Sequence, residues 1–122
     1  MKDFRNLKVW ERAHCLTLAV YKTTNRFPRE EVYGLTSQMR RCSASIAANL
    51  AEGCGKRGNN EFQRYLQIAS GSASELDYHL QLSRDLQFLR SSNYDALAKE
   101  LGELGRILTS LILKVDSERR LG

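Results

Sequence analysis

Proline, cysteine and signal-like apolar segments are scarce in this sequence, and each scarcity excludes a class of architecture. The single proline, Pro28, and the lack of any stretch rich in Pro, Gly and Ser leave no internal linker, so residues 1–122 are expected to form one domain. The three cysteines, Cys15, Cys42 and Cys54, are too few and too irregularly spaced for a disulfide framework or a zinc motif. The first residues contain no apolar segment typical of a secretory signal. Together with the free cysteines, this predicts a cytoplasmic protein.

Motifs that carry catalysis are also absent. The sequence contains no phosphate-binding glycine loop, no serine-hydrolase elbow and no dinucleotide-binding glycine motif. His14 and His79 are isolated and lack the spacing of metal ligands in helical bundles. We therefore predict that the protein is not an enzyme and has no catalytic residue, no cofactor and no metal site.

Basic residues outnumber acidic ones, and the excess lies in the first half of the chain. Residues 1–58 hold eleven Lys or Arg and five Asp or Glu, whereas residues 59–122 hold eight and nine. The formal net charge is +5. A basic half predicts attraction to a polyanion, of which nucleic acid is the usual example. The alternative is an ordinary solvated helical surface with a basic bias.

Apolar residues recur at helical spacing in four segments, and no strand-like alternation is long enough to compete. We expect helices over residues 7–26, over residues 36–52, from residue 59 or 60 to a turn at 90–93, and from residue 94 onwards. Their apolar faces are Trp10, Ala13, Leu16, Val20 and Tyr21; Leu35, Met39, Cys42, Ile46 and Leu50; Phe62, Leu66, Ala69, Ala73, Leu76, Leu80 and Ser83; and Leu97, Leu101, Leu104, Leu108, Leu111 and Val115. The spacing of the last two faces is typical of nearly antiparallel bundle packing. The predicted fold is all-α, an antiparallel up-down four-helix bundle.

Two segments are poorer in charge and bulk than surface helices usually are. Residues 42–51 carry no charge, which predicts burial on more than one side, beyond what one small domain supplies. Their ten residues are about half of the roughly 20 that span a bilayer, so no membrane is expected. The last helix contains two glycines, and each destabilises a helix by about 1 kcal/mol relative to alanine. Close approach of another helix would explain them. The alternative is a helix that is simply more flexible. The candidate interfaces of a homo-oligomer are Ala44 and Ala48 in the uncharged run, and Ala98, Gly102, Gly105 and Thr109 in the last helix.

Polar residues near the end of the second helix allow a structural or a chemical interpretation. Ser45, Asn49 and Glu52 lie on one strip, where the helix dipole disfavours a carboxylate in the last turn by roughly 0.3–1 kcal/mol. The Glu52 carboxylate could bind a ligand or act in catalysis. We favour a structural role, in which it joins the loop after the helix to the bundle. Gly53 is expected to end the helix in a left-handed conformation. Glu75 in the third helix also allows a structural or a chemical interpretation. Its side chain could face a subunit contact, an arginine or solvent.

Four basic residues are the candidates for contact with nucleic acid: Arg40, Arg41, Lys56 and Arg57. Backbone phosphates require only positively charged side chains, without base-specific geometry. Aromatic residues that could stack on bases are sparse beside these positions, which argues against sequence-specific recognition.

The run FPREEVYGLTSQMRRCSASIAANLAEGCGKRGNNEF resembles the signature of a bacterial four-helix-bundle family, the proteins encoded in intervening sequences of 23S ribosomal RNA genes. The matching positions are Trp10; Phe27, Pro28, Glu31, Tyr33, Gly34 and Leu35; Gln38, Arg40, Arg41, Ser45, Ile46, Asn49, Ala51, Glu52 and Gly53; Glu61 and Phe62; and Gly71, Ser72, Glu75 and Leu76. Two departures are Ala47, where proline is frequent, and Cys54, where an aromatic residue is frequent.

The resemblance implies a compact antiparallel bundle that assembles into a ring-like homopentamer, with no established enzymatic activity. It also implies an association with ribosomal RNA by gene location. The accessory proteins of diversity-generating retroelements look similar, and they bind nucleic acid and a reverse transcriptase. We therefore expect an oligomer that binds RNA or DNA without sequence preference. The alternative is a scaffold for a protein partner, and an enzyme or small-molecule binder built around Asn49, Glu52 and Glu75 is the least favoured hypothesis.

Overall fold

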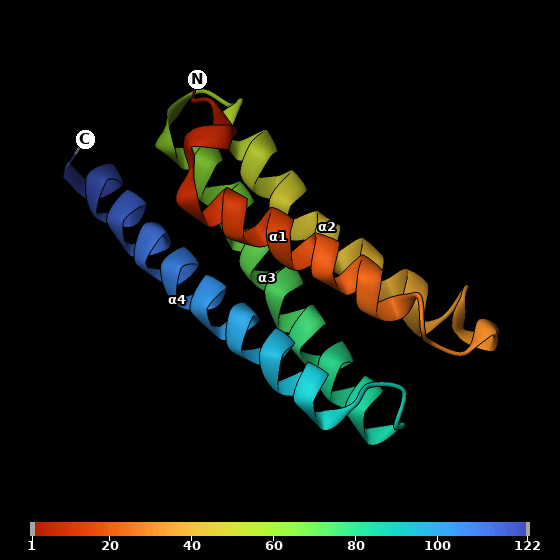
Figure 1. Cartoon of the computed structure of the whole chain (residues 1–122). Helices are drawn as coiled ribbons and strands as arrows, with labels where there is room; N and C mark the ends of the chain where they lie inside the picture. Colours follow the sequence, from red (N-terminus) through yellow and green to blue (C-terminus); the bar gives the residue numbers. More distant parts are fainter. Residues whose placement is uncertain (1, 122) are drawn as a thin grey trace.

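The computed structural model describes residues 2–121 and contains four α-helices (Figure 1). They are α1 (Lys8–Thr24), α2 (Leu35–Cys54), α3 (Gly58–Asp85) and α4 (Ser91–Leu121), with two short 3₁₀ helices, η1 (Phe4–Asn6) and η2 (Arg29–Glu31). No strand occurs within residues 2–121, so the all-α prediction is confirmed for this part of the chain. None of the described helices is long and apolar enough to cross a membrane.

Each α-helix packs against two others. Both α1 and α3 contact α2 and α4, whereas the pairs α1–α3 and α2–α4 make no close contact within the described residues. Figure 1 shows the two termini at one end of the molecule and the α1–α2 and α3–α4 connections at the other. The apolar faces predicted for the second and third helices are buried at every position, and the face of α4 is buried except at Leu111, which is half-buried. On α1, Trp10 is half-buried and Tyr21 is exposed.

The uncharged run of α2, residues 42–51, is covered largely by the chain itself. Because α2 lies between α1 and α3, the apolar face of the run has no exposed area. On the α1 side, Ser43 is also fully buried, and its carbonyl accepts a hydrogen bond from Thr17 Oγ1 at 3.1 Å. Of the whole run only Ala48 is exposed. Burial on more than one side is therefore observed, but neighbouring helices of the same chain supply most of it.

The α3–α4 connection differs from the prediction. A turn was expected at residues 90–93, but α3 ends at Asp85 and α4 begins at Ser91. The chain reverses at Gln87, whose φ of 65° is left-handed and cannot continue the helix. Leu89 follows and is buried against the core, which explains why the apolar pattern gave no sign that the helix had ended.

The α2–α3 connection corrects the predicted role of Gly53. α2 continues through Gly53 to Cys54, and the left-handed φ of 77° belongs instead to Gly58, the first residue of α3. A Cβ added to Gly53 would lie 2.9 Å from Tyr65 Cβ and 3.1 Å from Phe62 Cδ1. Glycine is needed at this position because α2 and α3 approach closely there, and not because the helix ends.

Residues 59 and 60, predicted as the start of the third helix because asparagine is a good N-cap, lie inside the first turn of α3, which begins at Gly58. Asn59 Nδ2 donates to Glu118 Oε2 at 3.4 Å, and Asn60 Oδ1 accepts from Arg119 Nε at 2.8 Å. These side chains join the start of α3 to the end of α4 instead of capping α3.

Candidate nucleic-acid interface

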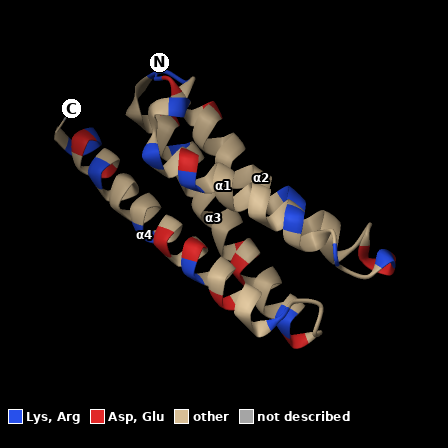
Figure 2. Cartoon of the chain, viewed as in Figure 1, with Lys and Arg blue, Asp and Glu red and all other residues tan. Residues whose placement is uncertain are grey.

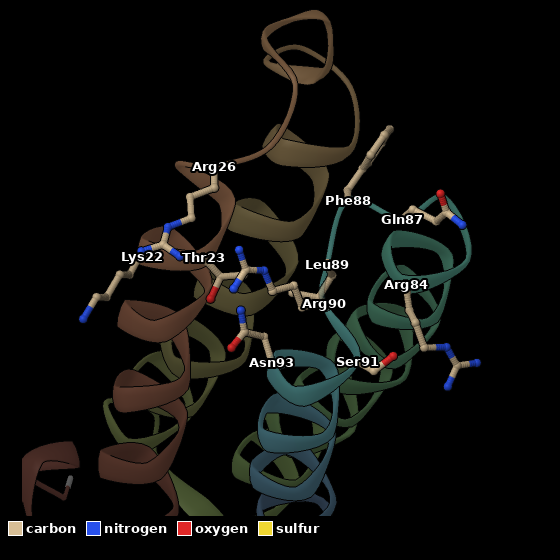
Figure 3. Close-up of a pocket in the computed structure, with 10 residues that line it drawn as sticks. All are labelled: Lys22, Thr23, Arg26, Arg84, Gln87, Phe88, Leu89, Arg90, Ser91 and Asn93. Atoms are coloured by element: carbon tan, nitrogen blue, oxygen red, sulfur yellow. The ribbon is translucent and has the colours of Figure 1, made fainter.

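A basic pocket lies at the end of the molecule that holds the α1–α2 and α3–α4 connections. Its volume is about 810 Å³, and it opens between the end of α1, the end of α3 and the start of α4 (Figure 3). Four basic side chains line it: Lys22, Arg26, Arg84 and Arg90. No carboxylate is among the residues that line it. The pocket is therefore positively charged and open to a ligand from solvent.

Three of these cations have no acidic partner within residues 2–121. Lys22, Arg26 and Arg90 are exposed and form no ion pair there. Figure 3 shows Arg26 and Arg90 pointing toward one another from opposite sides of the pocket. Arg84 differs, because it pairs with Asp85 at 3.3 Å and points away from the other three. The free positive charge of the pocket thus comes from the end of α1, from Arg26 just after α1, and from Arg90 just before α4.

The start of α4 adds a further feature that favours an anion. Ser91 and Asn93, in the first turn of α4, line the pocket. The N–H groups of a first helical turn have no acceptor within the helix, and the positive end of the helix dipole lies there. Guanidinium groups beside such a turn suit a phosphate, which accepts several charge-assisted hydrogen bonds at once.

Arg40 and Arg41, which we predicted to contact phosphate, instead form hydrogen bonds and an ion pair with neighbouring parts of the chain. Arg40 Nε donates to Thr24 Oγ1 at 2.9 Å, and its Nη2 donates to Asn25 Oδ1 at 2.9 Å. Arg41 forms an ion pair with Glu75 of α3. Arg40 therefore ties α2 to the end of α1, and Arg41 ties α2 to α3, which leaves neither side chain fully available to a ligand.

Lys56 and Arg57 lie at the other end of α2. Lys56 follows Arg40 by 16 residues, which is about 24 Å at a helical rise of 1.5 Å per residue, so the two predicted pairs do not form one surface. Both side chains are exposed, and neither forms an ion pair with the described residues. Lys56 Nζ lies 5.8 Å from the ring centroid of Tyr65. Figure 2 shows basic positions at both ends of the molecule, in keeping with this separation.

Sequence reasoning did not select Lys22, Arg26 or Arg90. The first two lie one helical turn apart near the end of α1, and the third lies far along the chain in its neutral half. The one available signal is that basic residues stand beside both connections at this end of the molecule. Only the packing of α1 against α4 shows that these connections share a pocket.

The predicted polar strip of α2 forms contacts with α3. Ser45 Oγ and Ser72 Oγ are 2.9 Å apart, and Asn49 Nδ2 donates to the Ser45 carbonyl at 2.8 Å and to its hydroxyl at 3.0 Å. Glu52 Oε1 accepts a hydrogen bond from Tyr65 OH at 3.2 Å. These contacts favour the structural interpretation of the strip. They also place the contact of Glu52 on α3, whereas we expected it to hold the loop after α2.

Glu75 faces an arginine and a histidine at the α2–α3 interface. Its Oε2 accepts a hydrogen bond from Arg41 Nη2 and lies 3.1 Å from His79 Nε2. Cys42 of α2 is fully buried beside them. Burial, followed by the negative charge of Glu75, raises the pKa of the Cys42 thiol to about 11, so it is protonated at neutral pH. We refer to Cys42, Glu75 and His79 as the α2–α3 cluster.

The small residues of α4 line an open groove beside α3. The groove has a volume of about 680 Å³, and Ala98, Gly102, Gly105 and Thr109 all line it. A Cβ added to Gly105 would meet no atom within 4 Å, and one added to Gly102 would meet only the Arg106 side chain, at 3.8 Å. Packing within one chain therefore does not explain these glycines. On α2, the other two interface candidates differ, because Ala48 is exposed and Ala44 is half-buried.

Comparison with known proteins places this architecture in a family. The family model described as 23S rRNA-intervening sequence protein matches residues 5–110. Among solved structures, the chain is similar to a protein with unknown function from the S23 ribosomal protein family of Bacteroides thetaiotaomicron, at 22% sequence identity and a TM-score of 0.77. That match covers 85% of this chain and 97% of the other. No curated protein matches this chain.

Proposed function

The chain belongs to the family of 23S rRNA-intervening sequence proteins, and from this premise we propose that it binds RNA or DNA through backbone phosphates. One observation carries the proposal: Lys22, Arg26 and Arg90 line one pocket without an acidic partner within residues 2–121. Binding of this kind depends on charge, is weakened by salt and has little sequence preference. Lys56 and Arg57, just beyond the opposite end of α2, would provide a second contact.

We also propose that the four helices form an up-and-down bundle that assembles into a ring-like homo-oligomer, with the homopentamer of the family resemblance as the expected form. The open groove along α4 supports this proposal, because its glycines leave room for a helix of another copy to approach. A ring would repeat the basic pocket. Each weak phosphate contact would then raise the effective concentration of the next one.

We propose further that the protein acts by binding, as a cytoplasmic protein, and not as an enzyme. The three side chains of the enzyme hypothesis, Asn49, Glu52 and Glu75, are engaged in hydrogen bonds to neighbouring helical residues. A scaffold for a protein partner without nucleic-acid binding is the competing function, and the same binding experiment separates the two.

The experiment measures fluorescence anisotropy of labelled single-stranded RNA and duplex DNA at increasing salt. The test variant replaces Lys22, Arg26 and Arg90 with alanine. The control variant replaces Lys8, Lys99 and Lys114, which are exposed, form no ion pair within the described residues and do not line the pocket. Both variants lose the same net charge.

We expect micromolar or tighter binding at about 50 mM salt, and a log–log salt dependence that is shallower by up to about three in the pocket variant. The control variant should retain most of the affinity. Equal losses in the two variants would show that the pocket has no special role. No binding by the unmodified protein at this salt concentration would refute nucleic-acid binding and favour the scaffold.

Oligomer formation is tested by light scattering coupled to size-exclusion chromatography. Replacing Gly105 with leucine fills the groove without meeting any atom of the same chain near its Cβ, so the helix itself is expected to tolerate the change. A reduced mass for this variant, beside an oligomeric unmodified protein, would support the interface. A single species of 13.9 kDa for the unmodified protein would refute it.

A further inference from the structure

The α2–α3 cluster brings together three kinds of metal ligand. One potential donor atom from each of Cys42, Glu75 and His79 lies within 4.8 Å of the other two. Glu75 and His79 are one helical turn apart on α3, so they project from the same face, and Cys42 reaches them from α2. Thiolate, imidazole and carboxylate are the three side-chain ligands that zinc takes in proteins.

The cluster also contains donor atoms that the chain itself leaves without a partner. His79 Nδ1 is buried and has no hydrogen-bond partner in the structure. Both hydrogen bonds to Glu75, from Arg41 and from His79, involve Oε2; Oε1 forms no hydrogen bond among residues 2–121 and is not buried, so it is accessible to a ligand. Leaving the buried His79 Nδ1 unpaired costs about 1–3 kcal/mol, which an ion or a water molecule bound at this atom would offset.

We propose that Cys42, Glu75 and His79 bind one divalent transition-metal ion of the zinc class at the α2–α3 interface. A tetrahedral zinc site separates its ligand atoms by roughly 3.5 Å, so rotation of the side chains must shorten the widest gap by about 1 Å. The ion's fourth position would take a water molecule, because the side chain of Glu75 is 35% exposed and leaves a path to solvent. Arg41 would keep its contact with Glu75 as an outer partner that orients the carboxylate.

The charges of the site are compatible with such an ion. A thiolate and a carboxylate together neutralise a divalent cation, which lowers the cost of burying it beside α2. Cys42 must lose its proton to bind, and its pKa of about 11 means that the metal displaces this proton at neutral pH. Glu75, His79 and Arg41 are the charged or titratable groups that face the thiol, and affinity is expected to rise with pH because metal binding releases the thiol proton.

Cobalt(II) is the probe for this site, because a cobalt–thiolate bond gives a charge-transfer absorption that no other ligand here produces. The full chain, reduced and freed of metal by a chelator, is titrated with Co²⁺ and the band is recorded; Zn²⁺ is then added to displace it. The test variants are Cys42→Ser and His79→Gln, which keep the size and polarity of the side chains. The matched control is Cys54→Ser, because Cys54 is also buried but belongs to no group of three potential ligands within residues 2–121, and Cys15→Ser controls for the exposed cysteine.

We expect one Co²⁺ per chain, displaced by Zn²⁺, and an affinity at least tenfold weaker in Cys42→Ser and His79→Gln but unchanged in both controls. Glu75→Gln should weaken binding while the thiolate band remains. The proposal is overturned if the unmodified protein gives no band, if the band survives Cys42→Ser, or if it is lost in Cys15→Ser or Cys54→Ser. Circular dichroism of each variant shows whether the helices are intact, and an unfolded Cys42→Ser leaves the decision to His79→Gln.

Discussion

Replacing Gly53 with alanine tests whether the close approach of α2 and α3 is the reason for glycine at this position. Alanine is favoured over glycine inside a helix by about 1 kcal/mol, so propensity alone predicts a more stable protein. The structure predicts the opposite, because the new Cβ would lie 2.9 Å from Tyr65 Cβ and 3.1 Å from Phe62 Cδ1. Carbon atoms in contact normally lie about 3.5–4.0 Å apart.

The clash is expensive because one of its atoms cannot rotate away. Tyr65 Cβ is attached directly to the α3 backbone, so relief requires α3 itself to move from α2 by roughly 0.5–1 Å, the shortfall from an ordinary contact. Overpacking of this kind typically costs about 1–3 kcal/mol. After the gain in helix propensity is subtracted, we expect Gly53→Ala to lower the free energy of unfolding by about 1 kcal/mol.

Gly71 provides the matched control. It is exposed, lies inside α3, and a Cβ added to it would meet no atom within 4 Å. Gly71→Ala should therefore raise the free energy of unfolding by about 1 kcal/mol, which separates the two variants by about 2 kcal/mol. In urea this is a difference of about 1 M between midpoints if the slope is near 2 kcal/mol/M. Equal stabilisation by the two substitutions, at the same protein concentration, would refute the packing explanation for Gly53.

Three further outcomes are expected. The Cys42 thiol ionises at lower pH in the unfolded chain than in the folded protein, so the free energy of unfolding falls as pH rises from about 9 to about 11. Urea unfolding in the presence of chelator at about pH 8 and pH 10 should show a smaller fall for Cys42→Ala than for the unmodified protein. Equal falls in the two proteins would contradict burial of the thiol as the cause. Ser45→Ala removes the hydroxyl that contacts Ser72 and should lower the free energy of unfolding by about 1–2 kcal/mol, whereas no change in the urea midpoint would show that this contact contributes nothing. A double-mutant cycle over Arg41 and Glu75 should give a coupling below about 1 kcal/mol that decreases with salt, because both side chains are partly exposed; a larger, salt-independent coupling would contradict this.

The four α-helices and the buried faces of α2 and α3 could be predicted from the sequence, whereas the predicted face of α1 includes the exposed Tyr21. Every apolar position predicted for α3, from Phe62 to Ser83, is buried, because the 4-3 spacing of a helix face is a local property of the chain. Helix ends were less predictable. Leu89 continues the apolar pattern beyond Asp85, although the helix has already ended, because it covers the end of the core.

The role of single residues depended on what other helices place beside them. Gly53 has the sequence context of a helix end, yet it is helical and faces Tyr65. Arg41 has the charge of a phosphate ligand, yet Glu75 of α3 holds it. Neither contact could be inferred from spacing, since each joins residues on different helices.

The sequence by itself determined the all-α class, the four amphipathic segments and the basic bias, because each follows from residue type and from short-range periodicity. Tertiary structure alone decided where charge and donor atoms converge. Lys22 and Arg90 share a pocket because α1 packs against α4, and Cys42 meets His79 because α2 packs against α3. Such convergence depends on the register and direction of packed helices, and burial of an apolar face fixes these only when all four helices are in place.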